Sequence, residues 1–269
     1  MPAQLHHERI AHSDREPERW LLMTHGIYGA GNNWRAIARK LTDQRPEWGV
    51  VLVDLRGHGR SERGEPPHTV AAAADDVRAL IAELGDIDAI AGHSFGGKVV
   101  LATRGLVEVR QTWVLDSNPG ARDAPLDAEQ GSAMRVLEML ERLPRTWAKR
   151  EDFVAAVTAE GYPLPLAQWL GMNIVPDASG ALVMRLDPAQ LRSLLTNYFA
   201  VELWDSAFDP AHGDLEIVLA DRSSSVDAAA RTRLEGAPPH VHVHHVDAEH
   251  WLHIEAPAAV VTLLAAELP

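Results

Sequence analysis

The residues that could do chemistry in this chain begin with a serine between two glycines. Residues 92–96 read Gly-His-Ser-Phe-Gly, a G-x-S-x-G motif that follows the apolar run 87–91 and overlaps the stretch 95–101, which can form a helix. Between a strand and a helix, this motif makes a sharp turn that holds the serine hydroxyl out at the carboxyl end of a sheet. We therefore predict that Ser94 is a nucleophile. The alternative is a chance Gly-Ser turn, because the bare pattern is common.

A serine hydroxyl is a poor nucleophile near neutral pH, so it needs a base within hydrogen-bond reach and a group that orients this base. We expect the base to be His250, which follows the apolar run 241–246 and precedes a final helix predicted over 256–268. His93, beside the nucleophile, is expected to pack within the turn. The competing histidines are His240, His242, His244, His245 and His253.

The histidines of the run 241–246 raise the alternative of a metal site. Alternation along a strand would put only His242 and His244 on the same face. No carboxylate or cysteine lies at a convincing spacing from them. We therefore expect neither a metal nor a cofactor, and we interpret these histidines as solvated side chains of an edge strand.

Strand-like and helix-like segments alternate along most of the chain. This alternation predicts an α/β fold with a mostly parallel central sheet and helices on both faces. In the predicted helix 70–84, Asp75 and Asp76 are expected on the solvent side. The predicted strands are 20–24, 50–54, 87–91, 112–116, 215–220 and 241–246, and the other predicted helices are 34–41, 95–101 and 256–268.

The alternation stops between Ser117 and about Phe208. This stretch is rich in aromatic residues and is typical of helices interrupted by prolines. We predict that 118–208 is a helical cap over the carboxyl edge of the sheet, where α/β folds place their ligands. Residues 1–117 and 209–269 would then form the core.

Composition narrows the classes of function. The chain has 269 residues and a net charge of −13, which argues against a nucleic-acid groove because phosphate binding needs clustered Lys and Arg. There is no cysteine, which excludes disulfides and thiol chemistry. The N-terminus lacks the features of a signal peptide, and no apolar run approaches about 18 residues. We expect a cytoplasmic protein without a membrane partner, and the sequence predicts no oligomeric state.

Taken together, these motifs resemble those of α/β-hydrolases over nearly all of the chain. A Gly-Gly-Lys after the nucleophile and an Asn-Asn-Trp at 32–34 are similar to a branch of small carboxylesterases, which includes bacterial acyl-ester hydrolases and mitochondrial abhydrolase-domain proteins. The resemblance implies a cap after the family's sixth strand and an oxyanion hole made by two backbone N–H groups, here those of Ile27 and Phe95. The segments that carry it are 25–29, 54–61, 92–98 and 249–251. Asp54, Arg56 and His58, within the second of these, are expected to be structural.

The acid that orients the base departs from the commoner family pattern. Most members carry it after the seventh strand, where this chain has Ser224. Asp116 ends the predicted strand 112–116 and can reach the same imidazole from the neighbouring strand, a placement that the resemblance to the small-esterase branch implies. We favour Asp116, whose other interpretation is a cap of the turn that follows. The remaining candidates are Asp221, then Asp227 and Asp187.

The expected activity is that of a serine carboxylesterase, which cleaves short-to-medium acyl esters through an acyl-enzyme. Thioesterases, lactonases and carbon–carbon bond hydrolases can use the same machinery, so they remain alternatives. A serine nucleophile argues against dehalogenases and epoxide hydrolases, whose nucleophile is an aspartate. An alternative of another class is a non-catalytic ligand receptor on the hydrolase fold.

Overall fold

The computed structural model describes residues 1–122 and 132–269. Its centre is a seven-stranded sheet of order β1-β3-β2-β4-β5-β9-β10, in which only β1 is antiparallel to its neighbour. The strands are β1 His7–Ile10, β2 Arg19–Thr24, β3 Trp48–Val53, β4 Ala89–His93, β5 Gln111–Leu115, β9 Asp214–Ala220 and β10 Val241–Val246. The predicted α/β class, with a mostly parallel sheet, is confirmed.

Two apolar layers enclose this sheet, one on each face, so its central strands are buried on both sides. Leu21 and Met23 of β2 face the layer that contains α1 and α11, whereas Leu22 faces the layer that contains α2 and α3. The core helices are α1 Arg35–Gln44, α2 Val70–Leu84, α3 Phe95–Thr103, α9 Ala228–Glu235, α10 Leu252–Glu255 and α11 Pro257–Glu267, with the short 3-10 helices η1 Gly31–Trp34 and η2 Pro210–His212.

Strand pairing corrects two sequence predictions. β4 covers Ala89–His93, two residues later than the apolar run 87–91, because Gly92 and His93 pair with the neighbouring strands. β1 was not predicted at all. It is four residues long and only half buried, so its pattern carries little hydrophobic signal.

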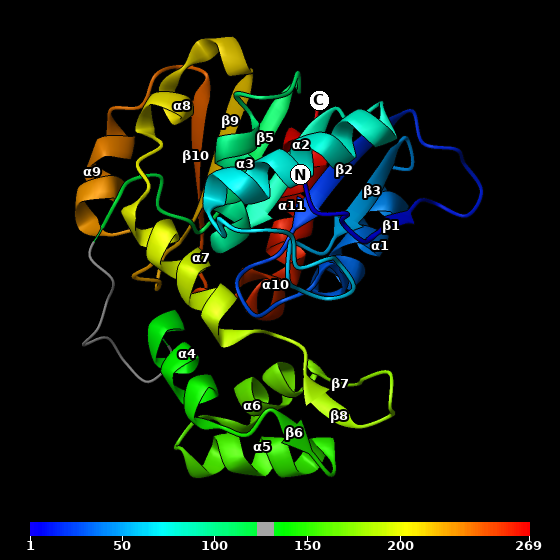
Figure 1. The fold of residues 1–269 in the computed structure, drawn as a ribbon. Coiled ribbons are helices and arrows are strands. Elements are labelled where there is room, and N and C mark those ends of the chain that lie inside the picture. Colours follow the sequence, from blue (N-terminus) through cyan, green and yellow to red (C-terminus); the bar gives the residue numbers. More distant parts are fainter. Residues whose placement is uncertain (123–131) are drawn as a thin grey trace.

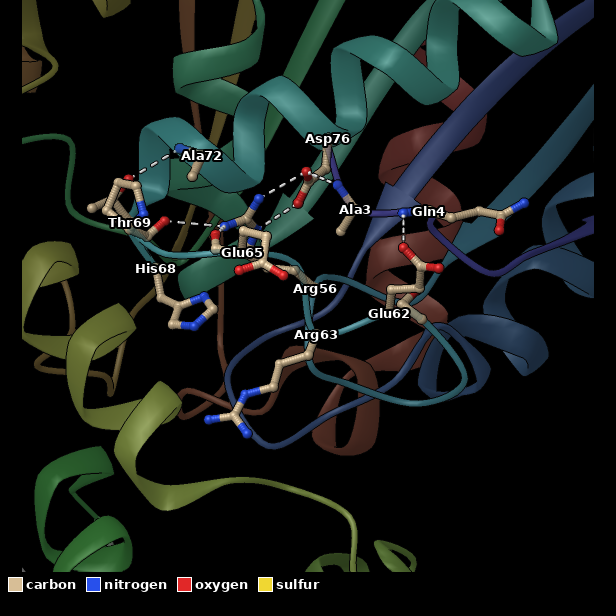
Figure 2. Close-up of polar contacts among 12 residues, drawn as sticks. Ala3, Gln4, Arg56, Glu62, Arg63, Glu65, His68, Thr69, Ala72 and Asp76 are labelled. Atoms are coloured by element: carbon tan, nitrogen blue, oxygen red, sulfur yellow. Dashed lines mark hydrogen bonds and ion pairs between the residues drawn. The ribbon is translucent and has the colours of Figure 1, made fainter. Parts of the chain in front are cut away.

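Asp76 lies inside the fold, not on the solvent side of α2 as we expected. Its carboxylate accepts hydrogen bonds from Arg56 Nε at 2.5 Å and Arg56 Nη2 at 2.9 Å, and from the backbone N–H of Ala3 at 2.6 Å (Figure 2). Both side chains of the ion pair are almost fully buried. A buried carboxylate is stable when charge-assisted hydrogen bonds replace its water. This long-range pairing therefore overrides the helical pattern.

The insertion between β5 and β9 contains α4 Ala133–Arg142, β6 Thr146–Trp147, α5 Arg150–Ala159, α6 Leu164–Gly171, β7 Ile174–Pro176, β8 Leu182–Met184, α7 Pro188–Ala200 and α8 Trp204–Phe208. Figure 1 shows α4, α5, α6 and β6–β8 as a lobe beside the core, with α7 leading back to it. The three short strands form a second sheet of order β6-β8-β7, which the all-helical prediction missed. Strands of two or three residues are too short for alternation to be read. Residues 123–131 of the predicted cap lie outside the described residues.

Lys98 ties the two connections of this insertion to the core. Its buried Nζ donates to the carbonyl of Gly120, where the chain enters the insertion, at 2.8 Å, and to those of Tyr198 and Val201, where the chain returns, at 2.6 and 2.9 Å. The helix that begins behind Ser94 therefore holds both ends of the lobe. In the described part of the chain, no helix is long and apolar enough to cross a membrane.

Candidate active site

Ser94 forms the turn between β4 and α3 by itself, since the strand ends at His93 and the helix begins at Phe95. Its φ of 54° is unusual for a residue with a side chain and marks a strained turn. A Cβ on Gly92 would lie 2.2 Å from the carbonyl oxygen of Gly96, so the glycine is required by close approach. The serine itself is half-buried and accessible.

His250 lies in the loop between β10 and α10. Its Nδ1 is 2.7 Å from Oδ2 of Asp116, and its side chain keeps 25% of its surface exposed while that of Asp116 is fully buried. His93 contacts this loop from the nucleophile strand, with its Nε2 2.7 Å from the backbone oxygen of His250. Burial lowers the pKa of His93 well below its usual value. Because a carbonyl oxygen only accepts hydrogen bonds, His93 donates from Nε2 to the backbone of His250.

Asp116 directly follows β5 and adopts a φ of 44°, which turns its side chain away from the strand path. Its Oδ1 accepts the backbone N–H of Ala220 at 3.2 Å, and its Oδ2 accepts the hydroxyl of Ser223 at 2.5 Å. A buried carboxylate requires such donors. The acceptor of His250 is therefore itself held by β9 and by the turn after it.

The serine-rich turn after β9 adds a contact that sequence reasoning missed. Ser225 Oγ lies 2.8 Å from His250 Nδ1. Ser224 occupies the position where most relatives were expected to carry the acid, and its two neighbours, Ser223 and Ser225, contact Asp116 and His250. The signal was present as a run of three serines, but only the fold shows which of them point inward.

The other candidate acids are engaged elsewhere. Asp221 Oδ1 contacts His245 Nδ1 at 2.7 Å. Asp227 and Asp187 accept backbone N–H groups at the N-termini of α9 and α7. Of the four candidates, the structure brings only Asp116 to His250.

The competing histidines are also placed by the fold. His253 packs against Trp34 and His93, and burial lowers its pKa to about 4. His242 Nδ1 and His244 Nε2 contact the two carboxylate oxygens of Glu216 at 2.8 and 2.6 Å. Our interpretation of this pair as simply solvated was wrong, because Glu216 reaches both rings from the neighbouring strand. No group of three or more ligating side chains among the described residues has the geometry of a metal site.

The predicted oxyanion loop is a tight turn closed by a hydrogen bond from Gly29 N–H to the carbonyl of Gly26 at 3.1 Å. Ile27 lies inside this turn, and a Cβ on Gly26 would lie 3.3 Å from Cβ of Ser94, so the loop packs directly on the nucleophile. Phe95 is the first residue of α3, where a backbone N–H has no partner within the helix. The positions of Ile27 and Phe95 are therefore compatible with two donors aimed near the serine.

The insertion holds this loop through Tyr28, whose φ is 69°. Asn173 Nδ2 donates to the Tyr28 carbonyl at 3.0 Å, and the Tyr28 hydroxyl donates to the carbonyl of Ala133 at 2.5 Å. Tyr28 is 3% exposed. The start of α4 and the turn after α6 thus both hold a strained residue next to the candidate donor Ile27.

Asp54, Arg56 and His58, which we expected to be structural, contact the scaffold. Asp54 accepts the backbone N–H groups of Gly31 and Arg60 at 2.7 and 2.8 Å. His58 Nδ1 contacts the carbonyl of Arg56 at 2.9 Å. These contacts hold the turn after β3 against the loop after β2.

Residues 21–263 match the model of the alpha/beta hydrolase family, and the chain belongs to that family. It is 25% identical over 258 residues to the sn-1-specific diacylglycerol lipase ABHD11 of Danio rerio, covering 91% of this chain and 78% of the relative. It is 34% identical over 137 residues to esterase YbfF of Escherichia coli, covering 51% of each. Its fold is similar to that of a marine microorganism esterase, with a TM-score of 0.85 at 21% identity over 99% of this chain and all of the other.

Proposed function

We propose that this protein is a serine carboxylesterase in which Ser94, His250 and Asp116 act as a catalytic triad. The observation that carries the proposal is the 2.7 Å contact between His250 Nδ1 and a fully buried Asp116. Ser94, in its strained turn, donates its backbone N–H to the carbonyl of Leu115, the residue before Asp116, at 3.0 Å. The similarity to an esterase and a lipase supports the same reaction class.

In this proposal, His250 Nε2 accepts the proton of the Ser94 hydroxyl as Oγ attacks the ester carbonyl. Asp116 holds the proton on Nδ1 and stabilises the imidazolium. The backbone N–H groups of Ile27 and Phe95 donate to the developing oxyanion. The protonated His250 then gives its proton to the leaving alcohol, and a water activated in the same way hydrolyses the acyl-enzyme.

The insertion supports a preference for short-to-medium acyl esters. Trp169 of α6 lies 4.8 Å from Trp251, ring centroid to ring centroid, next to the proposed base. Aromatic side chains commonly line pockets that hold apolar groups, and we propose that these two rings shield the acyl group from water. A series of p-nitrophenyl esters from acetate to palmitate tests this preference.

The decisive experiment combines labelling of Ser94 by a fluorophosphonate with turnover of p-nitrophenyl acetate. Ser94→Ala should abolish labelling and reduce kcat by on the order of 10⁴–10⁶, with an unchanged circular dichroism spectrum. Thioester and lactone substrates, tested in parallel, rank the neighbouring activities. Wild-type-like turnover in Ser94→Ala would refute the assignment, and labelling without turnover of any acyl substrate would favour a ligand receptor.

A further inference from the structure

A cavity of about 460 Å³ lies between the core and the insertion, and Ser94, Asp116 and His250 are not among the residues that line it. Its core wall includes Tyr28 and Gly29 of the proposed oxyanion loop. Its other wall includes Trp169, which packs against Trp251, the residue that follows the proposed base in the chain. The cavity is therefore a neighbour of the proposed active site without containing its reactive groups.

The acidic side chains of this cavity already have partners. Glu8 is paired with Arg35. Asp54 accepts the backbone N–H groups of Gly31 and Arg60 through its two oxygens. Among the described residues, no other Asp or Glu lines the cavity. Its carboxylates are thus occupied by the protein itself.

Among the described residues, the polar side-chain groups of the cavity that make no hydrogen bond within the protein are mostly donors. Arg60, from the turn after β3, and Arg185, directly after β8, are exposed lining residues whose described hydrogen bonds involve only their backbone N–H groups. The side-chain oxygens of Asn32 and Asn33 accept from Arg35 and from the backbone N–H of Ala30, which leaves their amide NH₂ groups as donors.

We propose that this cavity binds a small organic or inorganic anion, with a carboxylate or phosphate group held by Arg60 and Arg185. The planar guanidinium fork matches both anions with paired hydrogen bonds. Three arginines against two carboxylates make the lining cationic in a protein of net charge −13. Because one arginine belongs to the core and the other to the insertion, the anion bridges the two parts.

The site goes beyond the proposed ester hydrolysis and does not depend on the reactivity of Ser94. It is tested by calorimetric titration of Ser94→Ala protein with succinate and with inorganic phosphate. At least one anion should bind, and Arg60→Gln and Arg185→Gln should each weaken its binding about tenfold, the loss expected for one charge-assisted hydrogen bond.

The matched control is Arg110→Gln. Arg110 lines another cavity, of about 430 Å³, where it is paired with Asp88. That variant should bind the anion as tightly as its parent. The proposal is overturned if neither anion binds, or if Arg60→Gln and Arg185→Gln bind it no more weakly than Arg110→Gln.

Kinetics of the protein with Ser94 intact distinguish an anionic group of the substrate from a free anion. If it is part of the substrate, Arg60→Gln should raise KM for p-nitrophenyl hemisuccinate and leave KM for the neutral p-nitrophenyl butyrate unchanged. If it is a free ligand, the two substrates should respond alike and Arg60→Gln should remove any effect of added succinate or phosphate on turnover. Because the titration requires no catalysis, it can fail or succeed independently of the proposed function.

Discussion

The core contains two regions in which histidine contacts a buried carboxylate, and they differ in what surrounds the pair. Asp116 and His250 meet beyond the carboxyl ends of β5 and β10, and the strained, half-buried Ser94 follows the neighbouring strand β4. Glu216 meets His242 and His244 within the paired strands β9 and β10. The histidine–carboxylate contact is the same chemistry in both regions. Its position at the end of a strand, next to an accessible nucleophile, is what makes the first pair a candidate for catalysis.

The largest effect that would separate the two regions is expected at the histidines. His250→Ala should reduce kcat for p-nitrophenyl acetate by on the order of 10⁴–10⁶, because the proposed base is removed. His244→Ala, in the other pair, should retain most activity. If His253→Ala were more damaging than His250→Ala, the proposed base would be wrong.

Exchange of the carboxylates sharpens the comparison. Asp116→Asn keeps the shape of the side chain but favours the wrong imidazole tautomer, so kcat should fall by up to about 10⁴. Glu216→Gln and Asp221→Asn should change kcat at most a few-fold. Steady-state kinetics of the three purified variants check this ranking, and a crippled Asp221→Asn variant would return the acid to the turn after β9.

A smaller effect is expected from the hydroxyl that supports the first pair. Ser225→Ala removes the second contact of His250 Nδ1. His250 should then be less well positioned, and kcat should fall by about tenfold, which corresponds to the loss of about one hydrogen bond. KM should change little, because the hydroxyl contacts Nδ1 of the imidazole and not Nε2, the nitrogen proposed to face Ser94 and the substrate. Ser224→Ala is the matched control, and equal losses in both variants would indicate a general disturbance of the turn.

The smallest effect on activity, but a measurable one on stability, is expected at the second pair. Although burial opposes it, hydrogen bonds from His244 and His242 lower the pKa of Glu216, and the bond to Glu216 raises the pKa of His242. The Glu216 carboxylate therefore contributes to the free energy of unfolding above about pH 4.5, and this contribution is lost as the pH falls. His242 contributes to it below about pH 6.5, and this contribution is lost as the pH rises.

Glu216→Gln should accordingly lower the free energy of unfolding by about 1–3 kcal/mol. This loss should be largest between about pH 4.5 and 6.5, where both groups of the pair are charged. Urea unfolding at several pH values measures this difference. A loss of stability that is independent of pH would show that the charge of the pair is not what stabilises the strands.

Much of this arrangement could be predicted from local sequence. The G-x-S-x-G turn, the alternation of strands and helices and the late position of His250 indicated an α/β hydrolase fold, since each depends on residues that are close in the chain. The preference for Asp116 came from its position at a strand end together with a family resemblance. The structure places it against His250, and its catalytic role remains a proposal.

Only the tertiary structure decided which distant side chains meet. Asp76 faces Arg56 within the fold, and Glu216 contacts two histidines. The hydroxyls of Ser223 and Ser225 contact Asp116 and His250, respectively. Periodicity identifies which face of an element is apolar, but it does not identify the partner of a buried polar group. A buried charge is stable only when such a partner is present, and its partner can come from any part of the chain that the fold brings close.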